Sequence, residues 1–94
     1  MPTLLVPGVL RAEAGGERRL EITASGTLAA VLAEVGERWP QLARRIRDEQ
    51  GAVRRYVNVY VDGEDSRRGA GLDTPVADGS EIQVLPSVAG GCGP

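Results

Sequence analysis

The chain has 94 residues, a formal net charge of -2, and 41% hydrophobic and 26% charged residues. This length allows one small domain with a single core, and the near-balanced charge gives no general electrostatic case for binding nucleic acid. One cysteine excludes an internal disulfide framework. The lack of histidine removes the commonest general base, the usual nucleophile pairs and the imidazole metal ligand, so we expect neither catalytic residues nor a metal site.

The sequence contains no apolar run near the roughly 20 residues of a membrane span. Its start, Met1-Pro2-Thr3, lacks the basic residues of a signal peptide. We therefore expect a cytoplasmic protein with no membrane contact.

Two short β-rich runs open the chain, at residues 3–6 and 18–22. They predict the two strands of a hairpin, with Gly15-Gly16 as the turn signal. Residues 9–14 are too irregular to fix the loop or the register.

The principal helix is predicted over residues 27–38, because Leu28, Val31, Leu32 and Val35 have the spacing of one buried helical stripe. Ser25-Gly26-Thr27 offers an N-cap oxygen, and Trp39-Pro40 ends the helix.

A shorter helix is predicted over residues 41–48, with Arg44, Arg45 and Arg47 on its wet side. These arginines form either a solvated face or a phosphate or partner contact. We interpret Trp39 as a core or hinge anchor rather than a stacking platform.

Residues 55–61 are the clearest strand, with three valines that alternate with polar or aromatic residues. The valines are expected to face the helix, which places Tyr56, Asn58 and Tyr60 together on the opposite face. Two explanations of that face remain open. It is either a docking surface, to which Leu85 and Val88 add apolar contact, or ordinary cross-strand packing.

The remaining elements are a turn at Asp62-Gly63, a strand stub at Glu64-Asp65, a loop over residues 67–71, a turn at Asp78-Gly79 and a last strand over 81–85. This order predicts an α+β fold, a β-grasp with a mixed sheet of four to five strands packed against one main helix and a short second helix. The last strand should pair in the middle of the sheet beside the first.

The end of the chain, from Val88 through Ala89, Gly90 and Gly91, contains little that can pack in a core. A frayed terminus explains such a tail, and so does a substrate segment that threads into another protein. We therefore expect a β-grasp domain over residues 1–87 and a flexible tail over 88–94.

Three motifs carry a family resemblance: residues 55–65, with a Tyr-Val-Asn-Val-Tyr-Val-Asp-Gly core; residues 71–82, which end in Asp-Gly-Ser-Glu-Ile; and residues 85–91, which end in Gly90-Gly91. Together they resemble the ubiquitin-like sulfur-carrier family of MoaD, ThiS and, most closely, CysO. The resemblance implies that an E1-like adenylyltransferase uses ATP to activate the Gly91 carboxylate. Sulfur then replaces the adenylate, and the thiocarboxylate serves a sulfur-accepting synthase in cysteine, cofactor or thio-metabolite synthesis.

The family's active form ends in Gly-Gly, whereas here Cys92-Gly93-Pro94 follows Gly91. The resemblance implies that a JAMM-type metalloprotease cleaves between Gly91 and Cys92. Two alternatives remain: a cloning remnant, or a sulfur-bearing or redox role for Cys92 itself.

Three classes of function remain on the sequence alone. The first is the sulfur carrier, the second is a ubiquitin-like modifier conjugated to proteins through Gly91, and the third is an interaction module that never uses its tail. All eleven basic residues are arginine, so the chain has no lysine and cannot build lysine-linked chains on itself.

Overall fold

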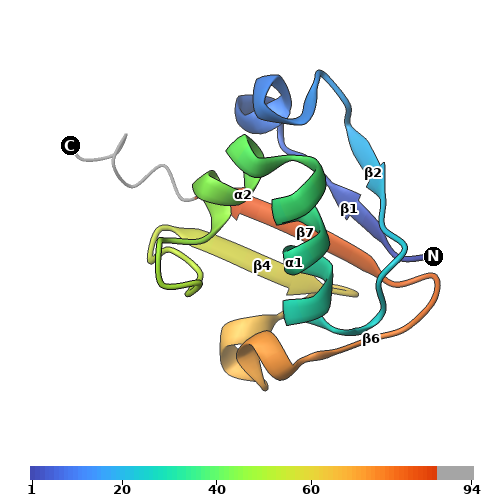
Figure 1. Cartoon of the computed structure of the whole chain (residues 1–94). Coiled ribbons are helices and arrows are strands. Elements are labelled where there is room, and N and C mark those ends of the chain that lie inside the picture. Colours follow the sequence, from blue (N-terminus) through green and yellow to red (C-terminus); the bar gives the residue numbers. More distant parts are fainter. Residues whose placement is uncertain (87–94) are drawn as a thin grey trace.

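The computed structural model describes residues 1–86 and shows a sheet with helices across one face (Figure 1). The main sheet has the strand order β2-β1-β7-β4-β5. Its strands β1 and β7 are parallel, and the other neighbouring pairs are antiparallel. The last strand therefore lies in the middle beside the first, which confirms the predicted β-grasp. The strand bounds are Thr3–Leu5 (β1), Arg19–Glu21 (β2), Val57–Val61 (β4), Glu64–Asp65 (β5) and Glu81–Pro86 (β7).

The core lies between this sheet and α1 (Leu28–Arg38). The predicted helical stripe is buried, with Leu28, Val31, Leu32 and Val35 each at most 1% exposed. Thr27 is the N-cap, and its Oγ1 accepts a hydrogen bond of 3.2 Å from the Ala30 N–H. Alternating residues of the strands face this stripe: Leu4, Leu20, Val57, Val59, Val61, Ile82 and Val84. Helices η1 (Gly8–Ala14) and α2 (Pro40–Ile46) add Leu10, Ala14, Leu42 and Ile46 to the same core.

Trp39 separates α1 from α2 (Pro40–Ile46) and interrupts the helical path. Pro40 is the first residue of α2, where its missing N–H leaves no helical bond unmade. Trp39 is half-buried against the core, and the Arg38 guanidinium lies 4.3 Å from the centre of its ring. These contacts confirm its interpretation as a core anchor.

The prediction for Arg47 was wrong. The helix ends at Ile46, and Arg47 is half-buried instead of solvated, because its Nε donates a 2.7 Å hydrogen bond to the Gly51 carbonyl. Arg44 and Arg45 are exposed, as predicted.

Tyr56 also differs from the prediction, because β4 begins at Val57 and Tyr56 lies in the preceding turn. The Val57 N–H closes that turn on the Arg54 carbonyl at 3.0 Å. Arg67 stabilises it further by donating to the carbonyl oxygens of Arg54 and Arg55.

Several short elements carry no periodic signal and were not predicted. Residues 9–14, left undetermined above, belong to the 3₁₀-helix η1 (Gly8–Ala14). The strand β3 (Gly26–Thr27) pairs with β6 (Pro75–Val76) in a separate two-stranded sheet. Two more 3₁₀-helices, η2 (Ser66–Arg68) and η3 (Gly71–Asp73), overlap the two ends of the loop predicted over residues 67–71. None of the helices within residues 1–86 is long and apolar enough to cross a membrane.

The predicted Asp62-Gly63 turn joins β4 to β5 with φ values of 52° and 86°. Positive φ at both central residues is the geometry of a two-residue hairpin. The Asp62 carboxylate also accepts 2.9 Å hydrogen bonds from the Ser80 hydroxyl and the Glu81 N–H. It thereby connects this hairpin to the start of β7.

Glu34 on α1 connects the helix to the chain after β2. Its carboxylate accepts hydrogen bonds from the Thr23 hydroxyl at 2.6 Å and the Ala24 N–H at 2.8 Å. Arg38 donates to the same carboxylate at 2.7 Å and to the Glu21 carbonyl at 3.0 Å. Burial alone raises the pKa of Glu34, but the hydrogen bonds from Thr23, Arg38 and Ala24 outweigh it and lower the pKa from 4.5 to about 2.

We expect Glu34→Gln to lower the free energy of unfolding by about 1–2 kcal/mol at neutral pH, because charge-assisted hydrogen bonds are lost. Since the folded pKa lies below the unfolded one, the carboxylate's contribution is complete above pH 4.5 and is lost as the pH falls toward 2. The difference between wild type and variant should therefore shrink over that range. Urea unfolding at a series of pH values measures it.

Glu37→Gln is the matched control, since Glu37 is exposed on the same helix. Its effect on stability should be small at every pH. A difference between wild type and Glu34→Gln that stays constant down to pH 2 would contradict the assignment.

Candidate functional site

A row of side chains crosses the face of the sheet that lies away from α1. Arg19 is opposite Leu5, Leu5 is opposite Gln83, Gln83 is opposite Tyr60, and Tyr60 is opposite Asp65. Directly opposed residues share one face of a sheet, so these five side chains form a continuous row from edge to edge. All five are exposed or half-buried, which makes this face available to a partner.

A second pair lies one step closer to the end of β7, where Asn58 is opposite Leu85. Leu85 is 39% exposed. The structure thus brings three predicted docking residues, Asn58, Tyr60 and Leu85, to the same open face. Tyr56 is 48% exposed in the turn before β4, so the strand's alternation does not place it with them. A docking role for these residues stays a prediction.

The end of β7 fixes the point from which the predicted tail starts. This strand is paired with β1 on one side and β4 on the other, and its last residue, Pro86, is opposite Val57. Proline has no N–H to donate to a ladder and so suits a strand end. The tail residues singled out from the sequence, Val88, Ala89, Gly90, Gly91 and Cys92, lie outside the described residues.

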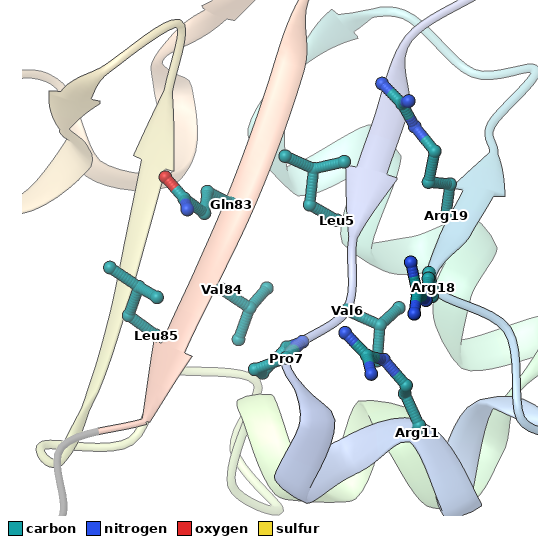
Figure 2. Close-up of a pocket in the computed structure, with 9 residues that line it drawn as sticks. All are labelled: Leu5, Val6, Pro7, Arg11, Arg18, Arg19, Gln83, Val84 and Leu85. Atoms are coloured by element: carbon teal, nitrogen blue, oxygen red, sulfur yellow. The ribbon is translucent and has the colours of Figure 1, made fainter.

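A groove of about 420 Å³ borders this strand end, between β1, β7 and η1 (Figure 2). Leu5, Pro7, Val84 and Leu85 supply apolar surface, and three arginines line it as well, namely Arg11, Arg18 and Arg19. Sequence reasoning did not single out this groove or Gln83. The alternation of residues 18–22 and 81–85 identifies Arg19 and Gln83 as outward-facing, but Arg11 has no such signal because η1 lacks a repeating pattern.

Within residues 1–86, no three or more Asp, Glu, Cys or His side chains lie together in a way suited to holding a metal ion. What this region presents is an open sheet face, an arginine-lined groove and an anchored strand end. Such features suit recognition by another protein.

Comparisons with known proteins agree with this description. A sequence model of the ThiS family matches residues 4–91. The sulfur carrier protein CysO of Mycobacterium tuberculosis is 39% identical over 92 residues, which cover 95% of this chain and 97% of the relative.

Solved structures share the fold over nearly the whole chain. A chain of the Amycolatopsis orientalis BexX/CysO complex has a TM-score of 0.85 and 32% identity, covering 93% of this chain and 96% of that one. The small archaeal modifier protein 1 of Methanosarcina acetivorans has a TM-score of 0.79 and 26% identity, covering 94% and 93%. The β-grasp is therefore of the ubiquitin-like type found in these proteins.

Truncation after Ser87 tests the predicted boundary between domain and tail. The buried hydrophobic cluster runs from Leu4 to Val84, so we expect the shortened chain to keep its melting temperature within about 2 °C, a change below 1 kcal/mol. Thermal unfolding followed by circular dichroism measures this. Truncation after Gln83 is the control and should unfold the domain, because it removes Val84 and three of the five residue pairs between β4 and β7. A large loss of stability on truncation after Ser87 would move the boundary into the tail.

Proposed function

The chain belongs to the ThiS family, and on that premise we propose that it is a CysO-type sulfur carrier whose Gly91 carboxylate becomes a thiocarboxylate. The observation that carries the proposal is the extent of the family match. It starts in β1 and ends at Gly91, three residues before the end of the sequence. The match therefore includes the Gly-Gly segment and leaves out Cys92-Gly93-Pro94.

The proposed chemistry requires activation because a carboxylate is a poor acyl donor. A Gly91 carboxylate oxygen attacks the α-phosphorus of ATP, pyrophosphate leaves, and a mixed anhydride with AMP forms. A sulfur nucleophile then attacks the carbonyl carbon, and AMP leaves with the electron pair of the broken C–O bond. Glycine leaves that carbon open to attack, and the carrier contributes a position but no catalytic side chain.

Three kinds of partner follow from this chemistry. An E1-like adenylyltransferase and sulfurtransferase activates Gly91, and a sulfur-accepting synthase receives the sulfur. Since the sequence continues to Pro94, the Gly91 carboxyl is held in a peptide bond until a JAMM-type metalloprotease removes residues 92–94. The BexX/CysO complex gives the second partner a precedent, because it contains a relative of this fold bound to another protein.

The described fold suits such a carrier. Five residues, Ser87 to Gly91, span at most about 18 Å when fully extended. An enzyme that binds Gly91 must therefore come within about 18 Å of the end of β7. Because β7 is paired on both sides, that root stays in place while the tail is bound.

We predict that only a chain ending at Gly91 is activated. Incubated with ATP, the E1-like enzyme and a sulfur source, this shortened chain should gain the mass difference of one oxygen replaced by sulfur, measured on the intact protein. The full-length chain should stay unchanged until the protease is added. Thiocarboxylation of the uncleaved chain would contradict the proposal that residues 92–94 block activation of Gly91.

A ubiquitin-like modifier conjugated through Gly91 is the second candidate, favoured by the similarity to a small archaeal modifier protein. The same incubation separates the two functions when cell extract is added. A carrier loses its sulfur and returns to the carboxylate, whereas a modifier appears in isopeptide bonds to other proteins. Multimers linked through lysine within the carrier are ruled out by its lack of lysine.

We also propose that Tyr60 on the open face takes part in docking the activating enzyme. Tyr60→Ala should weaken binding about 5- to 30-fold, the effect of losing 1–2 kcal/mol of contact. The melting temperature should change little, because Tyr60 is only partly covered. Tyr60→Phe is the matched control and should keep most of the affinity. Equal binding of all three proteins in calorimetry would assign Tyr60 to sheet packing alone.

A further inference from the structure

The arginine-lined groove overlaps the row containing Tyr60 at Leu5, Arg19 and Gln83, but it extends from there toward η1, on the β1 side of β7 and away from Tyr60 in β4. Its arginines come from three consecutive parts of the fold: Arg11 from η1, Arg18 from the residue before β2, and Arg19 from β2. Figure 2 shows the side chains of Arg11 and Arg18 close to Val6 and Pro7, and that of Arg19 farther along the sheet near Leu5. The groove thus combines apolar walls with three guanidinium groups.

Two of these guanidinium groups are not neutralised by the domain itself. Within residues 1–86, neither Arg11 nor Arg18 has a carboxylate within ion-pair distance, and the only partner of Arg19 is Glu81 at 3.4 Å. Both members of that pair are more than half exposed, so its contribution is small. The local positive charge contrasts with the net charge of -2 of the whole chain.

Two buried side-chain polar atoms of the described residues have no hydrogen-bond partner, Arg11 Nε and Glu13 Oε1, and the first belongs to this groove. A buried donor without a partner costs free energy, and more when the group is charged. The charge of the Arg11 guanidinium, which no carboxylate within residues 1–86 neutralises, is what an acidic ligand in the groove would pair with.

The groove also lies beside the end of β7, the strand that leads into the tail. Val84 and Leu85, which line it, immediately precede Pro86 at the end of β7. If the proposed function holds, the enzyme that takes up the tail lies within about 18 Å of Pro86 and covers this edge of the domain. The groove would then be filled by that enzyme's surface.

We propose that this groove binds an acidic segment of the enzyme that activates the tail, a stretch in which Asp or Glu alternates with aliphatic residues. The carboxylates pair with Arg11, Arg18 and Arg19, and the aliphatic side chains cover Leu5, Pro7 and Leu85. Arginine suits this role because its planar group forms two parallel hydrogen bonds with a carboxylate. The identity of the partner rests on the proposed function. The charge and the lining of the groove are independent of that function.

The first experiment uses a synthetic peptide, acetyl-Glu-Leu-Asp-Leu-Glu-Leu-Asp-amide, added to the full ¹⁵N-labelled chain and followed by NMR. We expect saturable shifts at the backbone amides of Val6 and Leu85 and at the Arg11 Nε, which weaken as salt is added. The same peptide with Gln and Asn in place of Glu and Asp should cause little change. Inorganic phosphate is a second control. Equal effects of the neutral peptide, or tighter binding of phosphate at the same residues, would overturn the proposal.

Charge-reversal variants test which arginines of the groove bind the peptide. Arg18→Glu should weaken peptide binding about tenfold, a typical cost of placing like charges across a contact. Arg18 is exposed, so folding should not depend on it. Arg44→Glu is the matched control, since it makes the same charge change at an exposed position of α2 and should stay within about twofold of wild type. Arg11→Gln tests the buried Nε, with its melting temperature measured in parallel.

The second experiment measures ATP-dependent adenylation of the chain ending at Gly91. Arg18→Glu should raise KM about tenfold and leave kcat unchanged, because the reacting carboxylate is untouched. If wild type is not adenylated, the proposed function fails. The peptide experiment then still tests whether the groove binds an acidic segment. If wild type is adenylated but neither KM nor peptide binding responds to Arg18→Glu, the groove proposal is wrong and the carrier function stands.

Discussion

Leu4 in β1 and Ile82 in β7 lie directly opposite each other, and both are fully buried. Their pairing joins the first strand of the chain to the last in parallel, which no hairpin can do, so the intervening residues must cross the sheet. The crossing segment contains α1, which covers the apolar face that the two strands share (Figure 1). The core, the strand order and the position of the tail's root all depend on this contact.

A small domain of this kind has little margin of stability, and its connections are fixed by a few polar side chains. Glu34 connects the chain after β2 to α1, Asp62 connects the β4–β5 turn to β7, and Arg67 stabilises the turn before β4. Each of these side chains bonds backbone groups that are distant in sequence. Backbone groups in irregular segments need such partners because no ladder satisfies them. The three contacts thus hold the connecting segments in fixed positions relative to the sheet.

The difference between regular elements and irregular connections also explains what could be predicted from the sequence. The stripe from Leu28 to Val35, the valines of β4 and the Asp62-Gly63 turn all carry local signals, and these elements were predicted correctly. Because the pattern also required a crossover, the central place of β7 followed from them. The contacts of Arg47 and Glu34 carry no local signal, since each depends on where a distant or irregular backbone group lies.

The candidate site was predictable in part for a related reason. Alternation along β4 and β7 places Asn58, Tyr60 and Leu85 on one face. Tyr56 was misplaced because the strand starts at Val57, two residues later than predicted, after a turn that the Arg67 guanidinium stabilises. The groove was missed because Arg11 comes from η1, and a short 3₁₀-helix has no apolar repeat to reveal its orientation.

In the proposed carrier role, recognition by a partner enzyme would depend mainly on the folded domain. Gly90-Gly91 presents backbone and no side chain, so an enzyme that binds only this segment cannot distinguish it from any other Gly-Gly tail. Discrimination between partners requires differences in contact energy, including repulsion of wrong partners. On the described surface, the row from Arg19 to Asp65 provides shape and hydrogen bonds, and the groove with Arg11 and Arg18 provides charge of one sign. Both include residues of β7, so in the proposed carrier role a partner that matches them binds beside the strand that precedes Gly91 in the sequence.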